Sequence, residues 1–371
     1  MNPKTWIEIS ESALRHNAQV FLDLASKAKV MAVVKSNAYG HGLIESARIL
    51  SKSGIHWFGV DHIDEALALR GAGIRKPILV LGYTPKHRLN DAIKNTISVV
   101  AYNIDTIKAL GQGRGKVKIH LPIETGLTRD GIDLTNLLDF LKQVGKYPNI
   151  EIEGVFSHFA NIEDTKSRAY ADHQLNEYQK AIEILKEHKI YPKYKHTASS
   201  AASILYSDTH FNLLRVGIAM YGLWPSEDTR HRKASLKLLP VLSWKTIVAQ
   251  VKNVTKGTPI SYGLTERMPK AGRIAVLPIG YADGFDRVGM SRRGSVLICG
   301  KRCKVMGRVC MNMSMVDVTG LNKIDTESEV TLIGSQGKAT VTAEDMADLV
   351  GTINYEIVAR LNPEIPRIVV K

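Results

Sequence analysis

The chain has 371 residues, of which 44% are hydrophobic and 23% charged, an ordinary composition with room for two globular domains. Residues 1–10 lack the features of a signal peptide, and no apolar run approaches the roughly 18 residues of a membrane helix. We therefore expect a cytoplasmic protein with no membrane partner. The three cysteines, Cys299, Cys303 and Cys310, indicate neither a disulfide framework nor a metal site.

The net charge of +14 raises the question of nucleic-acid binding. The basic residues are spread along the chain, however, and the densest stretches are 230–233 and 291–294. Neither stretch carries the interleaved aromatic residues of a single-strand binder. We therefore expect no nucleic-acid partner.

The first 220 residues alternate short apolar runs with segments of helical periodicity. Helical patterns cover 11–27 and 133–144, and a third follows Asp61 and ends at 71–73. The strand-like runs are 30–34, 57–60, 78–81, 97–100, 117–121, 152–156, 194–197 and 212–216. Eight strands alternating with helices predict a (β/α)8 TIM-type barrel. A doubly wound open sheet fits the same pattern and stays open as the alternative.

Residues 224–237 are polar and aperiodic, and they predict a boundary between a domain at 1–235 and one at 236–371. The second part begins with the alternating segment 241–251 and closes with helical patterns at 343–350, capped by Thr342, and at about 352–360. Further short strands are expected at 274–279, 295–299, 304–309, 313–318 and 329–334. This pattern predicts a smaller, mainly-β C-terminal domain.

A lysine stands where the first barrel strand ends, in the stretch VMAVVKSNAYGHG at 30–42. Lys is almost never buried without a partner, so Lys35 either marks the point where the strand surfaces or serves as a Schiff-base lysine. In a barrel the active site lies at the C-terminal ends of the strands. Tyr39, Arg129 and His158 follow strands in the same way and are expected at the same face.

Two small-residue turns follow the last two barrel strands. TASSAA at 197–202 contains Ser199 and Ser200, and RVGIAMYG at 215–222 contains Gly217 and Ile218. Free backbone N–H groups at such turns suit a phosphate, and barrels often bind phosphate after strands 7 and 8. A lysine and a phosphate cradle on one face fit pyridoxal 5′-phosphate.

The stretch AVVKSNAYGHG closely resembles the cofactor-lysine signature of the alanine racemases. Further matches follow in order from residue 32 to residue 367: HLPIETGLTRDG, GVFSHFA, ASSAA, LRVGIAMYG, ISYG, PIGYADG, GRVCMNMSMVDV and NYEIVARLNPEIPR. The family fold is a (β/α)8 barrel followed by a β domain, which agrees with the pattern above. The resemblance implies a pyridoxal-phosphate-dependent isomerase that interconverts L- and D-alanine and supplies D-alanine for peptidoglycan.

The resemblance also implies a cofactor site. Lys35 would carry pyridoxal 5′-phosphate, His158 would lie by its ring, and Arg215 would face the pyridine nitrogen. An arginine there cannot easily protonate the ring, so the cofactor would be a weaker electron sink with fewer side reactions. The phosphate would be held by Tyr39, Ser200, Gly217, Ile218 and Tyr355.

Racemisation needs proton exchange on both faces of the α-carbon, which two bases on opposite sides provide. By resemblance, Lys35 would abstract the proton from D-alanine and Tyr262 from L-alanine. Tyr262 would come from the C-terminal domain of the partner subunit, which implies a homodimer with composite active sites. Arg129 and the backbone N–H of Met311 would hold the substrate carboxylate, and Tyr281 would line the entrance.

The sequence departs from the family near the substrate. Many members carry a lysine, often carbamylated, at the position of Pro122, so the anion that orients Arg129 would be Glu124 or a bound chloride. Glu124, Ser199 and Asn312 also replace usual family residues. A racemase of broader specificity is therefore the nearest alternative. A non-catalytic cofactor carrier would lack the C-terminal domain, and a decarboxylase would carry a Glu-Pro-Gly-Arg motif that we do not find.

Overall fold

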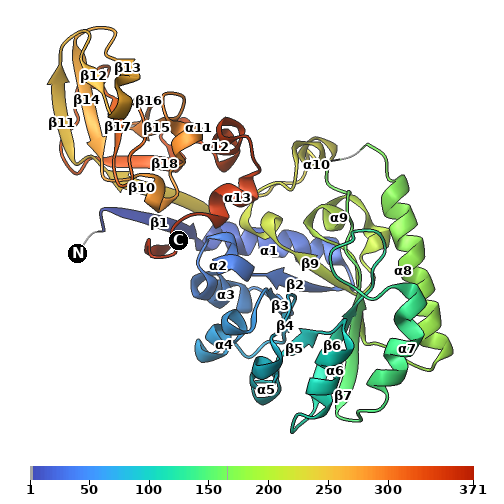
Figure 1. Ribbon diagram of the computed structural model, residues 1–371. Coiled ribbons are helices and arrows are strands. Elements are labelled where there is room, and N and C mark those ends of the chain that lie inside the picture. Colours follow the sequence, from blue (N-terminus) through green and yellow to red (C-terminus); the bar gives the residue numbers. More distant parts are fainter. Residues whose placement is uncertain (1–2, 165) are drawn as a thin grey trace. The chain divides into compact units, whose positions relative to one another are not determined.

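The computed structural model describes residues 3–164 and 166–371, which form two compact units. The barrel unit comprises residues 13–38 and 46–239, and the β unit comprises residues 3–12, 39–45 and 240–371. Each unit has its own strands and core (Figure 1).

The barrel unit is built on eight parallel strands in the order β8-β7-β6-β5-β4-β3-β2-β9. The strands are β2 (Lys29–Val33), β3 (Trp57–Val60), β4 (Ile78–Val80), β5 (Ser98–Val100), β6 (Val117–Pro122), β7 (Ile150–Phe156), β8 (Tyr194–His196) and β9 (Leu213–Val216). The ends of the sheet meet, because the backbone N–H groups of Asn212 and Arg215 donate to the carbonyls of Lys195 and Ala198. The predicted barrel is confirmed, and the open-sheet alternative is excluded.

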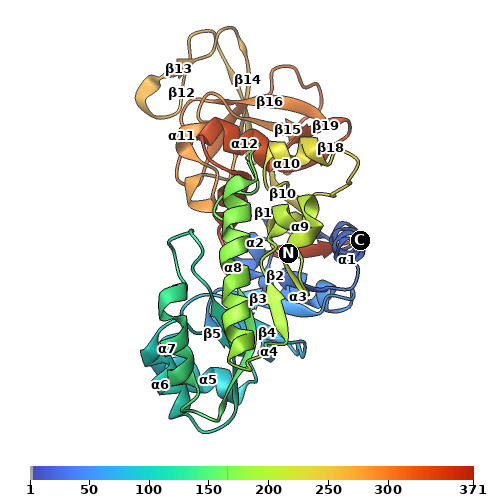
Figure 2. The same ribbon diagram turned by 90° about the vertical axis from the view of Figure 1, so that its right-hand side faces the viewer.

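Helices lie on the outer side of these strands (Figures 1 and 2). They are α1 (Glu11–Ala25), α3 (Leu43–Ser51), α4 (Ile63–Gly71), α5 (Leu89–Lys94), α6 (Ile104–Gly111), α7 (Leu134–Val144), α8 (Ala169–Glu187) and α9 (Ser200–Leu205). A buried apolar cluster joins the strands: Met31, Trp57, Leu79, Val100, Phe156, Tyr194 and Leu213. This packed layer supports the loops at the C-terminal ends of the strands.

The β unit contains a ten-stranded sheet in the order β11-β14-β17-β16-β15-β18-β10-β1-β20, with β19 paired to β18. Its strands are β1 (Thr5–Ser10), β10 (Leu242–Ile247), β11 (Gln250–Val254), β14 (Gly272–Leu277), β15 (Ser295–Ile298), β16 (Lys301–Met306), β17 (Ser314–Asp317), β18 (Glu329–Gln336), β19 (Ala339–Val341) and β20 (Arg367–Val370). β1 was predicted to belong to the first domain at 1–235, but it pairs with β10 and β20 in the sheet of the β unit.

In the second half of the chain, the structure differs from several local predictions. The segment 241–251 is two strands rather than one, and a two-stranded ribbon, β12 (Pro259–Ile260) with β13 (Glu266–Arg267), was not predicted. The boundary at 224–237 contains a short helix, α10 (Glu227–Arg232), because Ser226 Oγ caps it by accepting the Thr229 N–H.

The helices of the β unit are α11 (Arg287–Met290), α12 (Ala343–Val350) and α13 (Asn354–Ala359). The predicted helix 343–350 is confirmed. Its cap, Thr342, accepts from the Asp345 N–H while the Asp345 carboxylate accepts from the Thr342 N–H.

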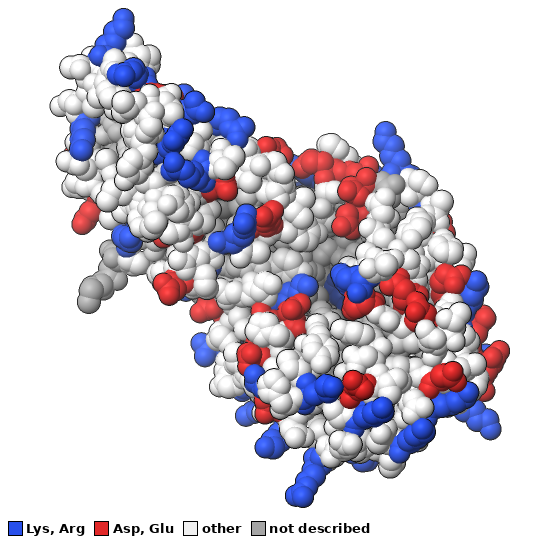
Figure 3. All heavy atoms as spheres, viewed as in Figure 1, with Lys and Arg blue, Asp and Glu red and all other residues white. Residues whose placement is uncertain are grey.

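On the face drawn in Figure 3, Lys and Arg are interspersed with Asp and Glu over the barrel unit and form no continuous basic stripe there. In the part of the chain that the structure describes, no helix is both long and apolar enough to cross a membrane.

The chain takes a strained path directly after β2, in the short segment α2 (Lys35–Tyr39). Ser36, Asn37, Ala38 and Tyr39 all have φ between 52° and 54°, in the left-handed region. Each such residue costs about 1–2 kcal/mol when it is not glycine. Strain of this kind persists where the surrounding structure imposes it, commonly at functional sites.

Gly40 ends this strained turn, and we expect Gly40→Ala to destabilise the protein. Gly40 has φ +82°, and a Cβ there would lie 1.8 Å from the Val358 carbonyl oxygen. An alanine at this position would be strained in two ways, by its left-handed backbone conformation and by the clash with the carbonyl oxygen. Together these should lower the free energy of unfolding by roughly 2–4 kcal/mol. Urea denaturation measures the loss.

Gly351→Ala is the matched control, because Gly351 has φ +83° but no atom within 4 Å of the added Cβ. It should cost only the left-handed penalty of about 1–2 kcal/mol. Equal losses in the two variants would contradict the clash at Gly40.

Candidate active site

Lys35 lies at the C-terminal end of β2, one residue beyond the buried Val34. Its Nζ is 3.5 Å from Oδ1 of Asp61, which follows β3, and 37% of the lysine side chain is exposed. The amine is therefore both oriented and accessible to a small molecule. The helix predicted to follow Asp61 is α4, and the residue at its cap position is His62.

Arg215 from β9 is the centre of the polar contacts at this end of the barrel, and only 6% of it is exposed. Its Nη1 donates to the His196 carbonyl at 2.8 Å, and its Nη2 donates to the carbonyls of Ser157 at 2.8 Å and Thr197 at 3.2 Å. Burial lowers the pKa of Arg215 to about 10, so the guanidinium remains charged at neutral pH. These three bonds all come from the terminal nitrogens of the guanidinium.

His158 follows β7, and its Nδ1 lies 3.1 Å from Arg215 Nη2. Arginine only donates, so Nδ1 is the acceptor and the proton of the neutral ring is on Nε2. Burial, followed by the charges of Arg215 and Arg129, lowers the pKa of His158 to about 3. The ring is therefore a neutral, flat surface at physiological pH.

The two predicted phosphate turns lie together in the barrel unit. Ser200, the first residue of α9, accepts with Oγ from the backbone N–H of Gly217 at 3.0 Å and of Ala219 at 3.5 Å. Ile218 begins the 3₁₀ turn Ile218–Tyr221 and is buried, so its N–H has no acceptor within the turn. A hydroxyl at the start of a helix and a buried N–H at the start of a 3₁₀ turn suit an anionic oxygen.

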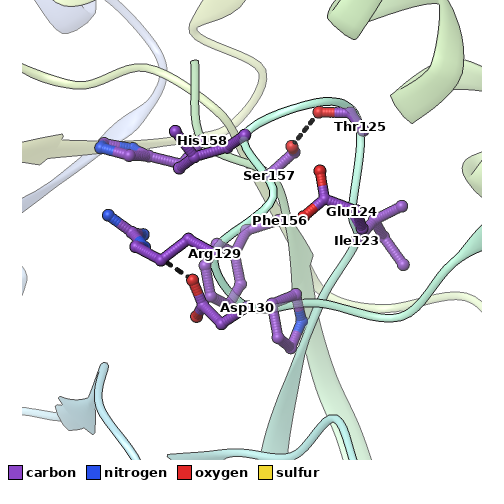
Figure 4. A pocket seen from close by; sticks show the side chains of 10 residues that line it. Ile123, Glu124, Thr125, Arg129, Asp130, Phe156, Ser157 and His158 are labelled. Atoms are coloured by element: carbon purple, nitrogen blue, oxygen red, sulfur yellow. Dashed lines mark hydrogen bonds and ion pairs between the residues drawn. The ribbon is translucent and has the colours of Figure 1, made fainter. Parts of the chain in front are cut away.

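Arg129 borders a small cavity of about 10 Å³, enough for a single water molecule, together with Glu124, Asp130 and His158 (Figure 4). Arg129 Nε donates to Asp130 Oδ1 at 2.7 Å. In the close-up the Arg129 guanidinium and the His158 ring extend toward the same side of the cavity.

Glu124 is not the partner of Arg129, contrary to the hypothesis from the sequence. Its Oε1 accepts from the Gly126 N–H at 2.5 Å. Burial would raise the pKa of Glu124, but the backbone N–H groups of residues 126–129 lower it overall. The Glu124 carboxylate therefore accepts hydrogen bonds from its own loop. The charge that balances Arg129 is supplied by the adjacent Asp130.

In the β unit, Tyr39 and Tyr355 lie edge to face with ring centroids 6.2 Å apart. Tyr355 is in the first turn of α13, and Tyr39 ends the left-handed segment. The two predicted phosphate-binding tyrosines are therefore brought together within this unit.

The other predicted residues of the β unit converge on one loop. Ser261, which precedes Tyr262, donates to the Arg308 carbonyl at 2.5 Å and lies 3.5 Å from Cys310 Sγ. The Tyr281 N–H donates to the Cys310 carbonyl, and the Ala282 N–H donates to the Met311 carbonyl. The large side chains on this loop cluster are exposed: 67% for Tyr262, 42% for Tyr281 and 56% for Met311.

The sequence analysis missed three buried polar residues in the barrel: His120, Glu153 and His196. His196 Nδ1 lies 2.8 Å from Arg215 Nη1, and His196 Nε2 lies 2.9 Å from His120 Nδ1. The signal was present, because each residue interrupts a predicted buried strand with a polar side chain.

The environment of His158 predicts that its imidazole does not titrate between pH 5 and pH 8. An unfolded histidine gains a proton near pH 6.5, whereas folded His158 gains one only near pH 3. The neutral ring therefore contributes fully to the stability of the fold above pH 6.5. This contribution is lost as the pH falls from 6.5 toward 3, because only the unfolded chain takes up a proton in that range. Nitrogen-15 spectra of histidine-labelled protein, assigned with His158→Gln, measure this; a midpoint above pH 5 would contradict it.

Comparisons with known proteins cover nearly the whole chain. The family model of the alanine racemase N-terminal domain matches residues 9–225, and that of the C-terminal domain matches residues 241–369. The alanine racemase of Methanococcus maripaludis is 39% identical over 98% of both chains. That of Carboxydothermus hydrogenoformans is 40% identical over 98% of this chain and 99% of its own.

Solved structures agree in fold. Alanine racemase from Bacillus anthracis with bound L-Ala-P has a TM-score of 0.94 and 38% identity, covering 100% of this chain and 96% of its own. A histidine racemase from Leuconostoc mesenteroides has a TM-score of 0.90 and 30% identity, covering 100% and 99%. With both family domains matched in order over a barrel unit and a β unit, the chain belongs to the alanine racemase family.

Proposed function

We propose that this protein interconverts L-alanine and D-alanine with pyridoxal 5′-phosphate bound through Lys35. The proposal rests on one observation above the others. The accessible amine of Lys35, the buried charged Arg215 and the neutral His158 lie at the ends of barrel strands in a chain of the alanine racemase family.

The residues present fit this cofactor. Lys35 offers an amine for its aldehyde, and Arg215 offers a donor for a neutral ring nitrogen. Ser200 Oγ and the buried N–H of Ile218 offer partners for its phosphate. A phosphate-binding role for Tyr39 and Tyr355, which lie together within the β unit, is proposed from the family resemblance.

When bound, pyridoxal 5′-phosphate supplies the electron sink that makes the α-hydrogen of the amino acid acidic. Lys35 Nζ then exchanges the α-proton on one face, that of D-alanine. The Tyr262 phenol oxygen exchanges it on the other face, that of L-alanine. Arg215 keeps its own proton, since its pKa is about 10, so it donates a hydrogen bond without transferring the proton.

We propose that Tyr262 acts in the active site of a partner subunit, in a homodimer. Tyr262 begins the 3₁₀ turn Tyr262–Leu264, in which Leu264 has φ 51°, and the preceding Ser261 has φ 66°. Leu264, Met311 and Met313 are also more than half exposed. Exposed apolar groups of this size in one domain are typical of an interaction surface.

Arg129, paired with Asp130, and the backbone N–H of Met311 are proposed to hold the substrate carboxylate, and Tyr281 to line the entrance. Broader specificity is tested by offering L-serine and L-histidine beside L-alanine, since the similar Leuconostoc protein is a histidine racemase. A cytoplasmic role in supplying D-alanine for peptidoglycan is proposed from the family resemblance.

The two-base mechanism predicts that Tyr262→Phe loses proton exchange with L-alanine but keeps exchange with D-alanine. Racemisation should fall by roughly 10²–10⁴-fold, because one proton transfer loses its base. In D₂O the variant should still exchange the α-proton of D-alanine through Lys35 while losing exchange from L-alanine. Proton NMR of the α-hydrogen follows both, and chiral separation follows racemisation.

Tyr191→Phe is the matched control, because Tyr191 is 71% exposed and lies in the barrel unit between α8 and β8. It should leave both exchange rates unchanged. Equal loss of exchange from the two enantiomers in Tyr262→Phe would exclude the assignment of one base to each face.

The composite site predicts that two inactive variants restore activity when mixed. Lys35→Ala and Tyr262→Phe subunits, unfolded and refolded together, should give about a quarter of wild-type racemisation, because half of the dimers carry one intact site. Each variant refolded alone is the control. No recovery in a mixture shown by mass to contain heterodimers would contradict a site shared between subunits.

A further inference from the structure

A continuous row of polar side chains crosses the interior of the barrel from Arg215 toward the N-terminal ends of the strands. Four neighbouring strands supply them: Glu153 from β7, His120 from β6, His196 from β8 and Arg215 from β9. The sequence of contacts is Arg215 Nη1 to His196 Nδ1 at 2.8 Å, His196 Nε2 to His120 Nδ1 at 2.9 Å, and His120 Nε2 to Glu153 Oε2 at 3.5 Å. All four residues are buried.

Arg215 fixes the direction of the two hydrogen bonds in the row, and the last contact, His120 Nε2 to Glu153 Oε2 at 3.5 Å, is an electrostatic contact longer than a hydrogen bond. Arg215 only donates, so His196 Nδ1 accepts and His196 carries its proton on Nε2. His120 Nδ1 must then accept from His196, which leaves the His120 proton on Nε2, facing the Glu153 carboxylate. Both histidines are neutral in this arrangement, and burial lowers the pKa of each.

The carboxylate at the far end is held in its ionised form. Ser98 Oγ donates to Glu153 Oε2 at 2.7 Å, and Lys118 Nζ donates to Oε1 at 2.8 Å. Burial alone would raise the pKa of Glu153, but the interactions with His120, Lys118 and Ser98 together lower it to about 2.

Aromatic rings fix the two imidazoles in place. His196 stacks on Phe156 with centroids 4.9 Å apart, and His120 packs against both Trp57 at 5.6 Å and Tyr194 at 6.2 Å. Gly154 leaves room for His120, because a Cβ there would lie 2.2 Å from its Nδ1. An apolar layer would fill this space without burying charge, so stability alone does not account for the row.

We propose that Glu153 is a positioning residue for Arg215, acting through the protons of His120 and His196. The carboxylate oxygen lies 3.5 Å from His120 Nε2 and favours the tautomer that carries a proton there. That tautomer leaves His120 Nδ1 to accept from His196, and His196 Nδ1 to accept from Arg215. Without the carboxylate, only the hydrogen bond from Arg215 favours this arrangement. The inference rests on the proposed role of Arg215 at the cofactor ring.

The test compares Glu153→Ala, which removes the acceptor, with Glu153→Gln, which keeps an acceptor oxygen. Solid-state nitrogen-15 spectra of the histidine-labelled protein, recorded without cofactor or substrate, report the tautomers. We expect new His120 and His196 signals in Glu153→Ala and near wild-type signals in Glu153→Gln. In the loaded enzyme, kcat for alanine should fall roughly tenfold to a hundredfold in Glu153→Ala, with KM little changed.

Adding formate distinguishes the proposed role of Glu153 from a purely structural one, because formate can replace its carboxylate but not its side-chain packing. Glu153, Ser98 and Lys118 line a cavity of about 680 Å³ at the N-terminal end of the barrel, so formate can reach the space vacated in Glu153→Ala. Formate should restore both the His196 signal and part of kcat. His120→Phe, which interrupts the row beyond that space, should not respond.

The outcomes separate this inference from the proposed function. Unchanged His196 signals in Glu153→Ala, or equal responses of Glu153→Ala and His120→Phe to formate, would overturn the role of Glu153 whatever the activity. A wild-type protein that does not racemise alanine, but whose His196 signal depends on Glu153, would refute the proposed function and leave the positioning role intact.

Discussion

The buried guanidinium of Arg215 is the constraint on which the barrel interior depends. A charge removed from water is tolerated only when it is hydrogen-bonded and compensated. The carbonyls of Ser157, His196 and Thr197 accept from Arg215 at the ends of the two neighbouring strands β7 and β8. The ionised Glu153 supplies the opposite charge through two neutral imidazoles. The strands that carry the site are therefore tied together by the same group that would face the cofactor.

The strained turn after β2 complements this rigid interior. The apolar strand delivers Lys35 to the mouth of the barrel, and four successive left-handed residues then turn the chain toward Gly40. Arg367 donates to the Gly40 carbonyl from both Nε and Nη2, which fixes the end of the turn within the β unit. The lysine is thus placed by backbone geometry on one side and by the Asp61 ion pair on the other.

Patterns within short windows of sequence were sufficient for much of the fold. The eight barrel strands were predicted because each is a short apolar run, and α12 because its helical pattern follows Thr342 as a cap. β20 was not predicted, because its partner β1 is more than 350 residues away in sequence and nothing local specifies that pairing. For the candidate site, the sequence placed Lys35 and His158 at the ends of barrel strands, and the family resemblance singled out Arg215. The motifs could not reveal that the Glu124 carboxylate accepts hydrogen bonds from the backbone of its own loop. They also could not reveal that His120 and His196 lie between Arg215 and Glu153.

The position of β1 affects the order in which the chain can fold during synthesis. β1 is made first, yet both of its neighbours, β10 and β20, lie beyond residue 241. Ile7 and Ile9 are fully buried in the finished sheet, so this strand exposes apolar side chains on the ribosome while the entire barrel is translated. The first strand can pair with β10 only after the whole barrel has been translated, and with β20 only when residues 367–370 emerge, so one edge of β1 stays unpaired until the end of synthesis.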